Sequence, residues 1–592
     1  MSLKSSQPRV GPIVILAAIV VLLGIAPAGL FAQTPGPCTR YAAGSVVQDT
    51  PNLFSINGVL RVNLIYNREV DADGRVLFCF TTPSGKESPT LHVQPGDLLI
   101  IKLTNEVPES VPATAMRMQM TNSGSDVCGA ANQTPASVNM HFHGTNVAPT
   151  CHSDEVIHTL VNTGQSFTYR VRFPEDETPG LYWYHPHVHG SANAAVQGGA
   201  SGAIVVTGLE RVQPAVSGLR QRIFVIRDQN VTGDPPPFGS NNVPSWDVSM
   251  NYVPIPYPDY TPGIIQMKPG EKELWRVANA SADTQLDLQL QYDGTPQMLQ
   301  VVGLDGAPTG PRDKKGHGTI IPMTDILLPT AARAEFIVTA PPATVSNATF
   351  LTLNVDTGAI GDNDPQRPLA LIQTVAGRDA GAPIKRELTM PTVAEAPGPQ
   401  RFDGLATAPV TAQRTLYFSE VITDEQDPGD WLNTQFFITV AGATPQVFNP
   451  DNPPAITTTQ GAVEDWTIEN HSEEVHEFHL HQIHFLLLAI NGVPVPAAQQ
   501  QLHDMIQVPY WTGTGPYPSV TVRMDFRGPD VGDFVYHCHI LAHEDGGMMA
   551  IIRVLPRTAS AAGPYGRLRT LLASIGWPSE EPQSSEWCGR RP

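Results

Sequence analysis

The chain has 592 residues, of which 41% are hydrophobic, enough to bury the cores of several domains. Its formal net charge is −20, from 56 acidic and 36 basic residues, and no basic run occurs. This charge argues against nucleic acid or an anionic membrane surface as a partner, and a cationic or neutral substrate fits it better.

The N-terminal residues resemble an export signal. Lys4 and Arg9 precede an apolar stretch that runs to Ala26-Pro27-Ala28. This order is typical of a secretory signal peptide, which we predict over residues 1–32. An uncleaved membrane anchor is the alternative. No other run reaches the roughly 18 apolar residues that a membrane-spanning helix needs, so we expect a secreted or periplasmic protein without a stable membrane partner.

Short β-rich runs separated by turns follow along the chain, which contains 50 Gly and 56 Pro. Examples are residues 98–103, 166–173, 202–206 and 222–226. Helical periodicity is scarce, so the sequence favours an all-β fold of sandwich or barrel domains.

A repeated pattern indicates three related domains. A Gly-containing turn followed by alternating apolar and polar residues occurs at 94–98, 268–272 and 460–464. A Pro- and Ala-rich stretch at 376–412 is typical of a linker. The predicted domains are residues 45–208, 218–376 and 412–556, followed by a tail at 557–592 with a short predicted helix at 566–577.

Histidines recur at alternate positions more often than chance allows. With 18 His among 592 residues, random placement predicts about half of one His-x-His pair. The chain has five pairs: His141/His143, His185/His187, His187/His189, His479/His481 and His537/His539. Residues i and i+2 of a strand face the same way, so each pair presents two imidazoles to neighbouring metal ions. Four pairs brought together would supply eight nitrogen ligands.

A second metal site is predicted around Cys538. In an extended segment this cysteine faces away from its two histidine neighbours, and His476, three residues before His479, faces the cysteine side. His543 and Met548 follow shortly after. Two imidazoles, a thiolate and a thioether are the ligands of a blue copper electron-transfer centre. Zinc is the main rival, but its structural and catalytic sites do not use eight paired histidines with one cysteine.

Together these motifs resemble the copper signatures of the multicopper oxidases, in particular bacterial laccase-like members. The signatures are His141-Phe142-His143-Gly144, His185-Pro186-His187, His476-x-x-His479-Leu480-His481 and His537-Cys538-His539-Ile540-x-x-His543-x-x-x-x-Met548. The resemblance covers residues 45 to 556 and implies three cupredoxin-like Greek-key β-domains. The first and third would supply the copper ligands, and the middle one would be mainly structural and substrate-facing.

The resemblance also implies four copper ions per chain, with every ligand position filled. The type 1 ligands would be His476, Cys538, His543 and axial Met548. The type 2 ligands would be His141 and His479, and the type 3 ligands His143, His185, His187, His481, His537 and His539. Because the axial ligand tunes the reduction potential, we expect a low-to-middle potential.

Two carboxylates are expected to supply protons for dioxygen reduction. Asp154 follows the first motif where laccases carry an acidic residue, and Glu544 follows His543 as in bacterial members. A solvated loop carboxylate is the alternative for each.

The chain departs from the family at two positions. Glu477 stands where many members have proline, and Gln482-Ile483 replaces a common glycine before His484. Either change could alter access to His476, where we expect electrons to enter.

Further residues extend these motifs. His189 and His484 are predicted to hydrogen-bond near the copper sites rather than bind copper. Met116, Met118 and Met120 alternate along the chain, and packing is favoured over Cu(I) binding.

The six cysteines do not form a disulfide scaffold, although an oxidising compartment permits bridges. Cys128 and Cys151 bracket the first motif and are predicted to pair, and Cys588 is predicted to pair with Cys38 or Cys79. The spacing leaves the connectivity open.

The leading functional hypothesis is a copper-dependent oxidoreductase that oxidises phenols or aromatic amines one electron at a time and reduces dioxygen to water. The alternative enzyme is a metallo-oxidase acting on Cu(I), Fe(II) or Mn(II), for which the acidic charge and the methionines are weak support. Copper nitrite reductase needs no type 3 pair, and a non-enzymatic electron carrier would leave eight histidines without a purpose.

Overall fold

The computed structural model describes residues 36–109, 128–231, 243–313, 315–375, 389–390, 401–423 and 431–557. The predicted signal peptide, the helix at 566–577, the methionines at 116–120 and Cys588 lie outside the described residues. Within them, 35 strands form six sheets, and the α-helices are short. The all-β prediction is confirmed. No helix of the described residues has the length and apolar character to span a membrane.

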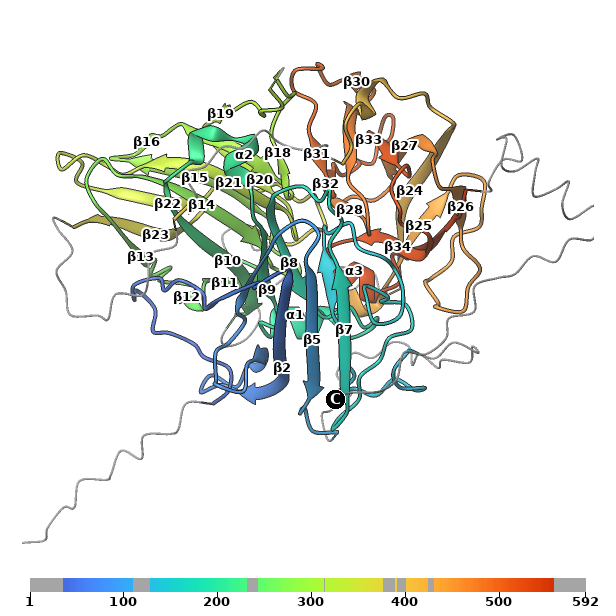
Figure 1. Cartoon of the computed structure of the whole chain (residues 1–592), viewed down its shortest axis with the longest axis horizontal. Coiled ribbons are helices and arrows are strands. Elements are labelled where there is room, and N and C mark those ends of the chain that lie inside the picture. Colours follow the sequence, from blue (N-terminus) through green and yellow to red (C-terminus); the bar gives the residue numbers. More distant parts are fainter. Residues whose placement is uncertain are drawn as a thin grey trace, which may run out of the picture. The chain divides into compact units, whose positions relative to one another are not determined.

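Two sheets are built from the first third of the chain, drawn in blue to teal in Figure 1. The first has the order β1 (Asn52–Phe54), β4 (Thr90–Val93), β9 (Gly202–Val206), β8 (Gly180–His185) and β6 (His141–His143). The second has the order β3 (Val76–Thr81), β2 (Val59–Val70), β5 (Leu98–Asn105) and β7 (Ser166–Arg172). The helices α1 (Ala192–Gln197) and α2 (Leu209–Val212) and the 3-10 turn η1 (Pro214–Val216) follow β8 and β9.

The middle of the chain forms the next two sheets. One has the order β12 (Val253–Ile255), β11 (Trp246–Met250), β10 (Arg220–Asn230), β14 (Lys272–Asn279), β21 (Arg333–Thr339), β17 (Leu299–Leu304) and β18 (Ala307–Pro308), with β19 (Ile321–Met323) on β17. The other has the order β13 (Gly263–Met267), β23 (Arg367–Thr374), β22 (Ala348–Thr352), β15 (Leu286–Tyr292) and β16 (Thr295–Pro296), with β20 (Asp325–Leu328) on β15.

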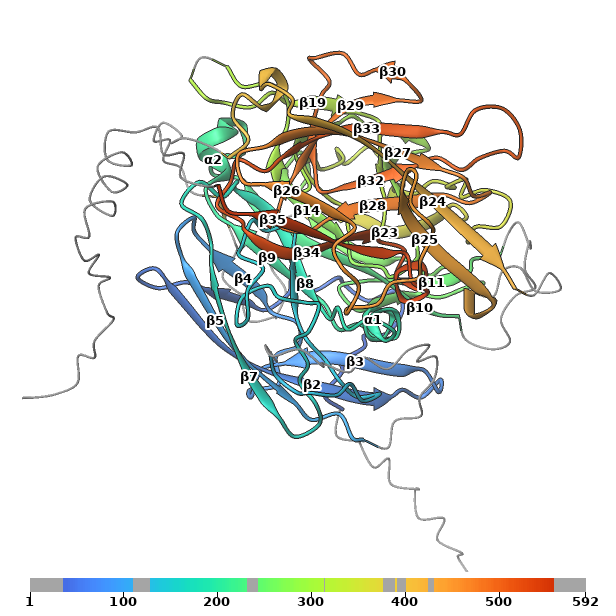
Figure 2. The ribbon, with the colours of Figure 1, turned by 90° about the vertical axis from the view of Figure 1, so that its right-hand side faces the viewer.

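The last third of the chain, drawn in orange to red, forms two more sheets. One has the order β25 (Thr434–Val440), β24 (Ala412–Ile422), β27 (Val463–Asn470), β33 (Ser519–Asp525), β29 (Phe485–Ile490) and β30 (Val493–Pro494), with β31 (Leu502–His503) on β29. The other has the order β26 (Ile456–Thr459), β35 (Met549–Leu555), β34 (Gly532–Cys538), β28 (His476–Leu480) and β32 (Met505–Val508), and Figure 2 shows β34 beside β35. The helix α3 (Leu541–Asp545) connects β34 to β35, and η2 (Leu405–Thr407) and η3 (Trp431–Asn433) lie before β24 and β25.

The runs predicted at 98–103, 166–173, 202–206 and 222–226 fall on β5, β7, β9 and β10. Each sheet takes its strands from one of the three predicted domain ranges, whose limits stay predictions.

Buried apolar clusters connect these ranges. Trp183 of β8 lies in the same cluster as Trp275 of β14, which joins the first range to the second. Ile157 lies in a smaller cluster with Val535 and Met549, which joins the first range to the third. This packing holds the end of β8 and the end of β34 in one buried region, where the histidine motifs lie.

Two disulfides connect the four described cysteines other than Cys538. Cys128 pairs with Cys151, as predicted. Cys38 pairs with Cys79, so the prediction that Cys588 bonds to one of them is wrong. The reason is tertiary, since the pairing of β2 with β3 brings Cys79 to the buried place that Cys38 also occupies.

Candidate metal centre

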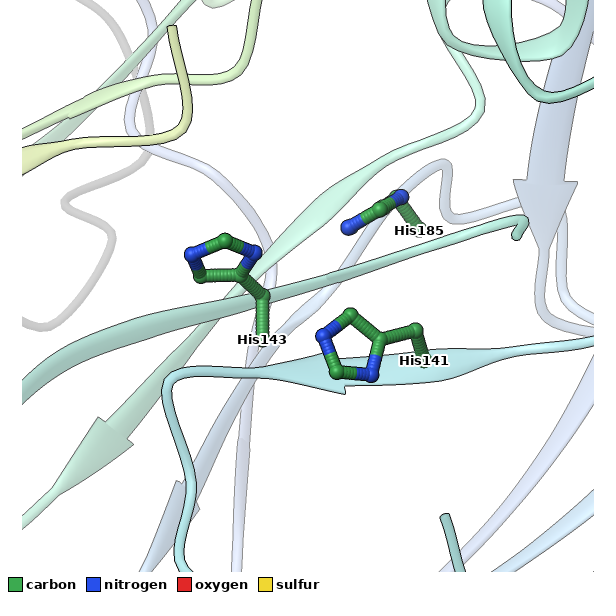
Figure 3. Close-up of side chains that lie close together, drawn as sticks. All are labelled: His141, His143 and His185. Atoms are coloured by element: carbon green, nitrogen blue, oxygen red, sulfur yellow. The ribbon is translucent and has the colours of Figure 1, made fainter. Parts of the chain in front are cut away.

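Two antiparallel strand pairs position the histidine motifs. In the pair of β6 and β8, His141 lies opposite His185. In the pair of β28 and β34, His479 lies opposite His537, and Phe478 lies opposite Cys538. Figure 3 shows the rings of His141, His143 and His185 gathered together. Strand pairing therefore places each motif beside another, as the alternation of facing residues predicts.

The eight histidines of four motifs form one buried cluster, the histidine cluster. Its members are His141, His143, His185, His187, His479, His481, His537 and His539, each at most 2% exposed. The rings of His141 and His481 stack with centroids 3.8 Å apart, and those of His143 and His479 stack at 4.0 Å. The cluster therefore joins the first predicted domain to the third.

Three of these side chains already have the geometry of a metal site. The Nε2 atoms of His187, His481 and His537 lie 3.1, 3.2 and 3.3 Å from one another. The centre of such a triangle lies about 1.9 Å from each corner, close to the roughly 2.0 Å of a metal–imidazole bond. Two further groups have one nitrogen per histidine within 4.8 Å of the others: His141/His143/His185 and His141/His479/His481.

Hydrogen bonds to backbone carbonyl groups orient several of the histidine rings. The Nδ1 atoms of His185, His479 and His537 donate to the carbonyls of Pro186, Asp504 and Cys538, each at 2.8 Å. In contrast, the Nε2 atoms of His141, His185, His479 and His539 have no hydrogen-bond partner in the described part of the chain. Leaving a buried polar atom unpaired costs about 1–3 kcal/mol, so these inward-facing nitrogens fit a site built for metal ions.

The protonation of the cluster also suits metal binding. Burial lowers the pKa of every cluster histidine, to about 3 for His187 and about 4 for His479, and well below the usual value for His141 and His143. The same holds for His185, His481, His537 and His539. The rings are therefore neutral at physiological pH, the form in which histidine binds a metal.

A separate group surrounds Cys538, the free cysteine of the described residues. Its Sγ lies 3.7 Å from the Nδ1 atoms of both His476 and His543, which are 3.1 Å apart. Met548 is fully buried in the same apolar cluster, and its carbonyl accepts the Cys538 N–H at 3.0 Å. A trigonal His₂Cys set with a nearby methionine fits copper, because soft thiolate and thioether ligands with imidazole define the blue copper site.

Comparison with known protein families agrees with this geometry. Two family profiles, both described as "Multicopper oxidase", match residues 111–210 and 421–558. The first match contains the motifs of β6 and β8, and the second contains those of β28 and β34. The chain belongs to the multicopper oxidase family.

Individual relatives are distant. "Multicopper oxidase mco" of Staphylococcus haemolyticus is 32% identical over 95 residues, which is 15% of this chain and 20% of that protein. The chain thus matches about a fifth of that relative's length. A laccase of Bacillus subtilis is 23% identical over 428 residues, 65% of this chain and 73% of that protein.

Among solved structures, a multicopper oxidase from Campylobacter jejuni described as a metallo-oxidase has a TM-score of 0.60 at 20% identity, over 87% of this chain and 96% of that chain. McoA from Aquifex aeolicus has a TM-score of 0.60 at 18% identity, over 87% of this chain and all of that one (100%). These likenesses show that this multicopper oxidase has the fold of its family.

Asp154 bonds to the cluster from outside. Both carboxylate oxygens lie 3.0 Å from Nδ1 of His141, and Oδ1 also accepts the Phe142 N–H at 2.9 Å. The amide of Gln482 donates to Oδ2 at 2.6 Å. Burial raises the pKa of Asp154 well above its usual value, and the N–H groups of Phe142 and Gln482 oppose that rise. Since its oxygens are occupied by donors, Asp154 is suited to orienting His141.

Gln482 adopts a backbone conformation that most side chains avoid, with φ 63°. In this conformation its side chain makes the hydrogen bond to Asp154. The departure noted in the sequence therefore supports Asp154 and does not touch His476.

Glu544 lies on α3, beside two other members of the cluster. Its carboxyl oxygens lie 3.5 Å from Nδ1 of His187 and 3.4 Å from Nδ1 of His537, and the side chain is fully buried. Neither oxygen has a hydrogen-bond partner in the described part of the chain. Burial and the neighbouring Asp545 raise its pKa well above the usual value. Because no described group donates a hydrogen bond to its oxygens, Glu544 is suited to hold a proton beside the cluster.

The two histidines beyond the copper motifs differ from each other. His484 donates from Nε2 to the carbonyl of Asp305 at 2.6 Å. Both ring nitrogens of His189 lack a hydrogen-bond partner within the described residues, although the ring is 2% exposed. The predicted hydrogen-bonding role is thus seen for His484 and not for His189.

Arg333 and Asp504 also support the cluster, and no sequence motif predicted either residue. The Asp504 carbonyl holds His479, and its Oδ1 lies 3.6 Å from Nε2 of His143. Arg333 of β21 donates from Nη1 to Asp504 Oδ1 at 2.7 Å, from Nη2 to Oδ2, and from Nε to the Leu181 carbonyl at 3.1 Å. Burial acts to raise the pKa of Asp504, but the Arg333 guanidinium outweighs it and the pKa is lowered. The middle of the chain therefore stabilises a site whose predicted ligands lie elsewhere.

We expect Arg333→Met to destabilise the protein strongly, because it leaves the buried Asp504 charge unpaired. Breaking a buried pair from one side costs about 3–5 kcal/mol. Thermal unfolding of the copper-loaded protein should show a lower midpoint and a loss of bound copper. The double variant Arg333→Met/Asp504→Asn, which removes the charge as well, should recover much of the midpoint. A single variant as stable as the wild type would contradict this role.

A cavity of about 150 Å³ reaches the Cys538 group at His543, and His476 is not among its lining residues. The cavity favours His543 over His476 as the ligand nearest to a bound substrate, and electron entry at His476 stays a prediction. His476 is fully buried, and its Nε2 is hydrogen-bonded to the Ser472 hydroxyl at 3.1 Å. The ring edge of His543 instead faces Glu474 at the cavity wall, with Nε2 and Oε1 3.3 Å apart. Loop packing, which sequence motifs do not encode, decides which ligand is accessible.

Proposed function

We propose that this multicopper oxidase couples the one-electron oxidation of phenols or aromatic amines to the four-electron reduction of dioxygen to water. It would hold one type 1, one type 2 and two type 3 copper ions. The copper ions would supply the one-electron redox chemistry and the place of dioxygen reduction. The observation that carries the proposal is the position of Cys538, which belongs to the His476/His543 group while its neighbour His537 belongs to the histidine cluster.

The chain connects the two groups by covalent and hydrogen bonds. The carbonyl of Cys538 accepts from Nδ1 of His537 at 2.8 Å, and Cys538 is bonded directly to His537 and His539 in the sequence. Electrons accepted beside Cys538 would therefore cross to the histidine cluster through one tripeptide. Glu544 would hold a proton between His187 and His537 for the reduction of dioxygen.

The cavity at His543 supports a small substrate. A cavity of about 150 Å³ has the size of one that holds a benzene molecule. Phe436 and Trp246 contribute aromatic surface to its wall, and His543 contributes a ring edge. A single phenolic or anilinic ring placed there would lie against a predicted type 1 ligand.

The same cavity gives a second candidate, a metallo-oxidase. Four carboxylates line it: Asp283, Asp362, Glu420 and Glu474. Oxygen ligands of this kind suit Fe(II) or Mn(II). The Campylobacter jejuni structure of the same fold is described as a metallo-oxidase.

The test is to count copper per chain and record optical and EPR spectra, and then to follow oxygen uptake with a phenol, an aromatic amine, Fe(II), Mn(II) and Cu(I) separately. Four copper ions, a blue band and faster uptake with the organic substrates would support the first proposal. Faster uptake with a metal ion, reduced in Glu420→Gln, would support the second. One copper ion and no uptake would contradict both.

We also propose that the protein is secreted or periplasmic. The two disulfides, Cys38–Cys79 and Cys128–Cys151, support an oxidising compartment. Mass spectrometry of the protein from the native cell fractions should find it outside the cytoplasm, with an N-terminus past the predicted 1–32 signal.

A further inference from the structure

The backbone of Glu477 contacts the sulfur of the predicted type 1 site. Glu477 directly follows His476 in β28, and its N–H donates to Sγ of Cys538 with an N–S distance of 3.4 Å. The Ile540 N–H also bonds to this sulfur. Since Cys538 is 0% exposed, the two N–H groups contact the sulfur where water does not reach it.

Other contacts of Glu477 hold that N–H in place. Its carbonyl accepts the His539 N–H at 2.8 Å. Its carboxyl accepts the Thr330 N–H at 3.1 Å and contacts the Thr330 hydroxyl, which itself lies 2.6 Å from the His539 carbonyl. Thr330 belongs to the middle of the chain, so groups from two regions fix the peptide that faces the sulfur.

A hydrogen bond to a copper-bound thiolate withdraws electron density from the sulfur. The thiolate then donates less to Cu(II), which favours the reduced state, and hydrogen bonding around this sulfur is one of the features that tune the potential of such sites. Proline at this position would have no N–H to donate. The bond from residue 477 to the sulfur therefore depends on a residue other than proline there.

We propose that the Glu477 N–H raises the type 1 reduction potential above the value that the axial Met548 and the other ligands would set without it. This inference rests on the proposed copper chemistry of Cys538. It makes Glu477 a positioning residue that acts through the sulfur, and it widens the range of reductants that the site can oxidise.

The test compares Glu477→Pro with Glu477→Ala in the copper-loaded protein. Alanine removes the carboxyl and keeps the N–H, whereas proline removes both, so the difference between the two variants reports the N–H. Spectroscopic redox titration of the blue band with a given mediator should show a lower potential for the proline variant than for the alanine variant. The equilibrium constant for reduction of Cu(II) to Cu(I) should be about tenfold smaller, which is 59 mV for a one-electron couple. Equal potentials in the two variants would overturn the proposal.

A measurement on the wild type decides the matter if the proline variant does not fold. Pulsed EPR of protein labelled with ¹⁵N-glutamate should show a hyperfine coupling between the type 1 Cu(II) and the Glu477 backbone nitrogen, because this N–H donates to the copper-bound sulfur. Absence of that coupling would overturn the proposal. Both measurements depend on the blue centre and not on oxygen uptake, so a blue protein that consumes no oxygen would contradict the proposed function while the potentials still decide the role of Glu477.

Discussion

Replacing Cys538 with serine is expected to abolish the blue band and to lower substrate-driven oxygen uptake by at least about a thousandfold, or roughly 4 kcal/mol of activation free energy. The reason is that Cys538 supplies the sulfur of the His476/His543 group and is also joined to the histidine cluster through His537. A serine hydroxyl is not the soft ligand that a blue copper site needs.

The number of copper ions bound per chain tells most directly which site the Cys538→Ser variant has lost. The histidine cluster has its own buried ligands, so Cys538→Ser should retain three of the four expected copper ions and the EPR signal of the type 2 site. Met548→Leu is the matched control, because it keeps the thiolate and should keep a blue band at an altered potential. A serine variant that is still blue, or that loses all of its copper, would contradict the prediction that the Cys538 group and the histidine cluster bind copper as two separate sites.

Replacing Glu544 with glutamine is expected to slow reoxidation of the reduced enzyme by dioxygen by about 10²–10⁴-fold, the usual contribution of a general acid. Glutamine has a similar shape but no acidic proton to give between His187 and His537. Anaerobic reduction by substrate should proceed at the wild-type rate, since Glu544 is not among the residues that line the cavity.

Stopped-flow mixing separates these two half-reactions. Glu544→Asp, which restores a carboxyl, should recover part of the reoxidation rate. Asp154→Asn should behave differently, because Asp154 accepts hydrogen bonds from Phe142 and Gln482 and orients His141, so a weakened or altered type 2 EPR signal is the expected result. A glutamine variant with normal reoxidation would show that protons reach the cluster from elsewhere.

The local sequence was enough to predict the strands and the way the metal-binding side chains face. Alternation along a strand is a property of neighbouring residues, so the facing of His141 with His143, and of Cys538 away from His537, followed from spacing alone. The all-β fold followed in the same way from short apolar runs between glycine and proline turns. The disulfide between Cys128 and Cys151 could be predicted from the sequence because the two residues are only 23 positions apart.

Tertiary structure decided the contacts that support the site. Arg333 and Asp504 are 171 residues apart, and Gln482 and Asp154 are 328 apart, so neither pair leaves a local pattern. The accessibility of His543 rather than His476, and the pairing of Cys38 with Cys79, depend likewise on how distant segments pack. The sequence by itself determined the ligand types and the faces on which they lie, because those depend on strand geometry. Only the packed structure decided which carboxylates, amides and backbone groups meet them, because those contacts form between strands that the spacing of residues does not bring together.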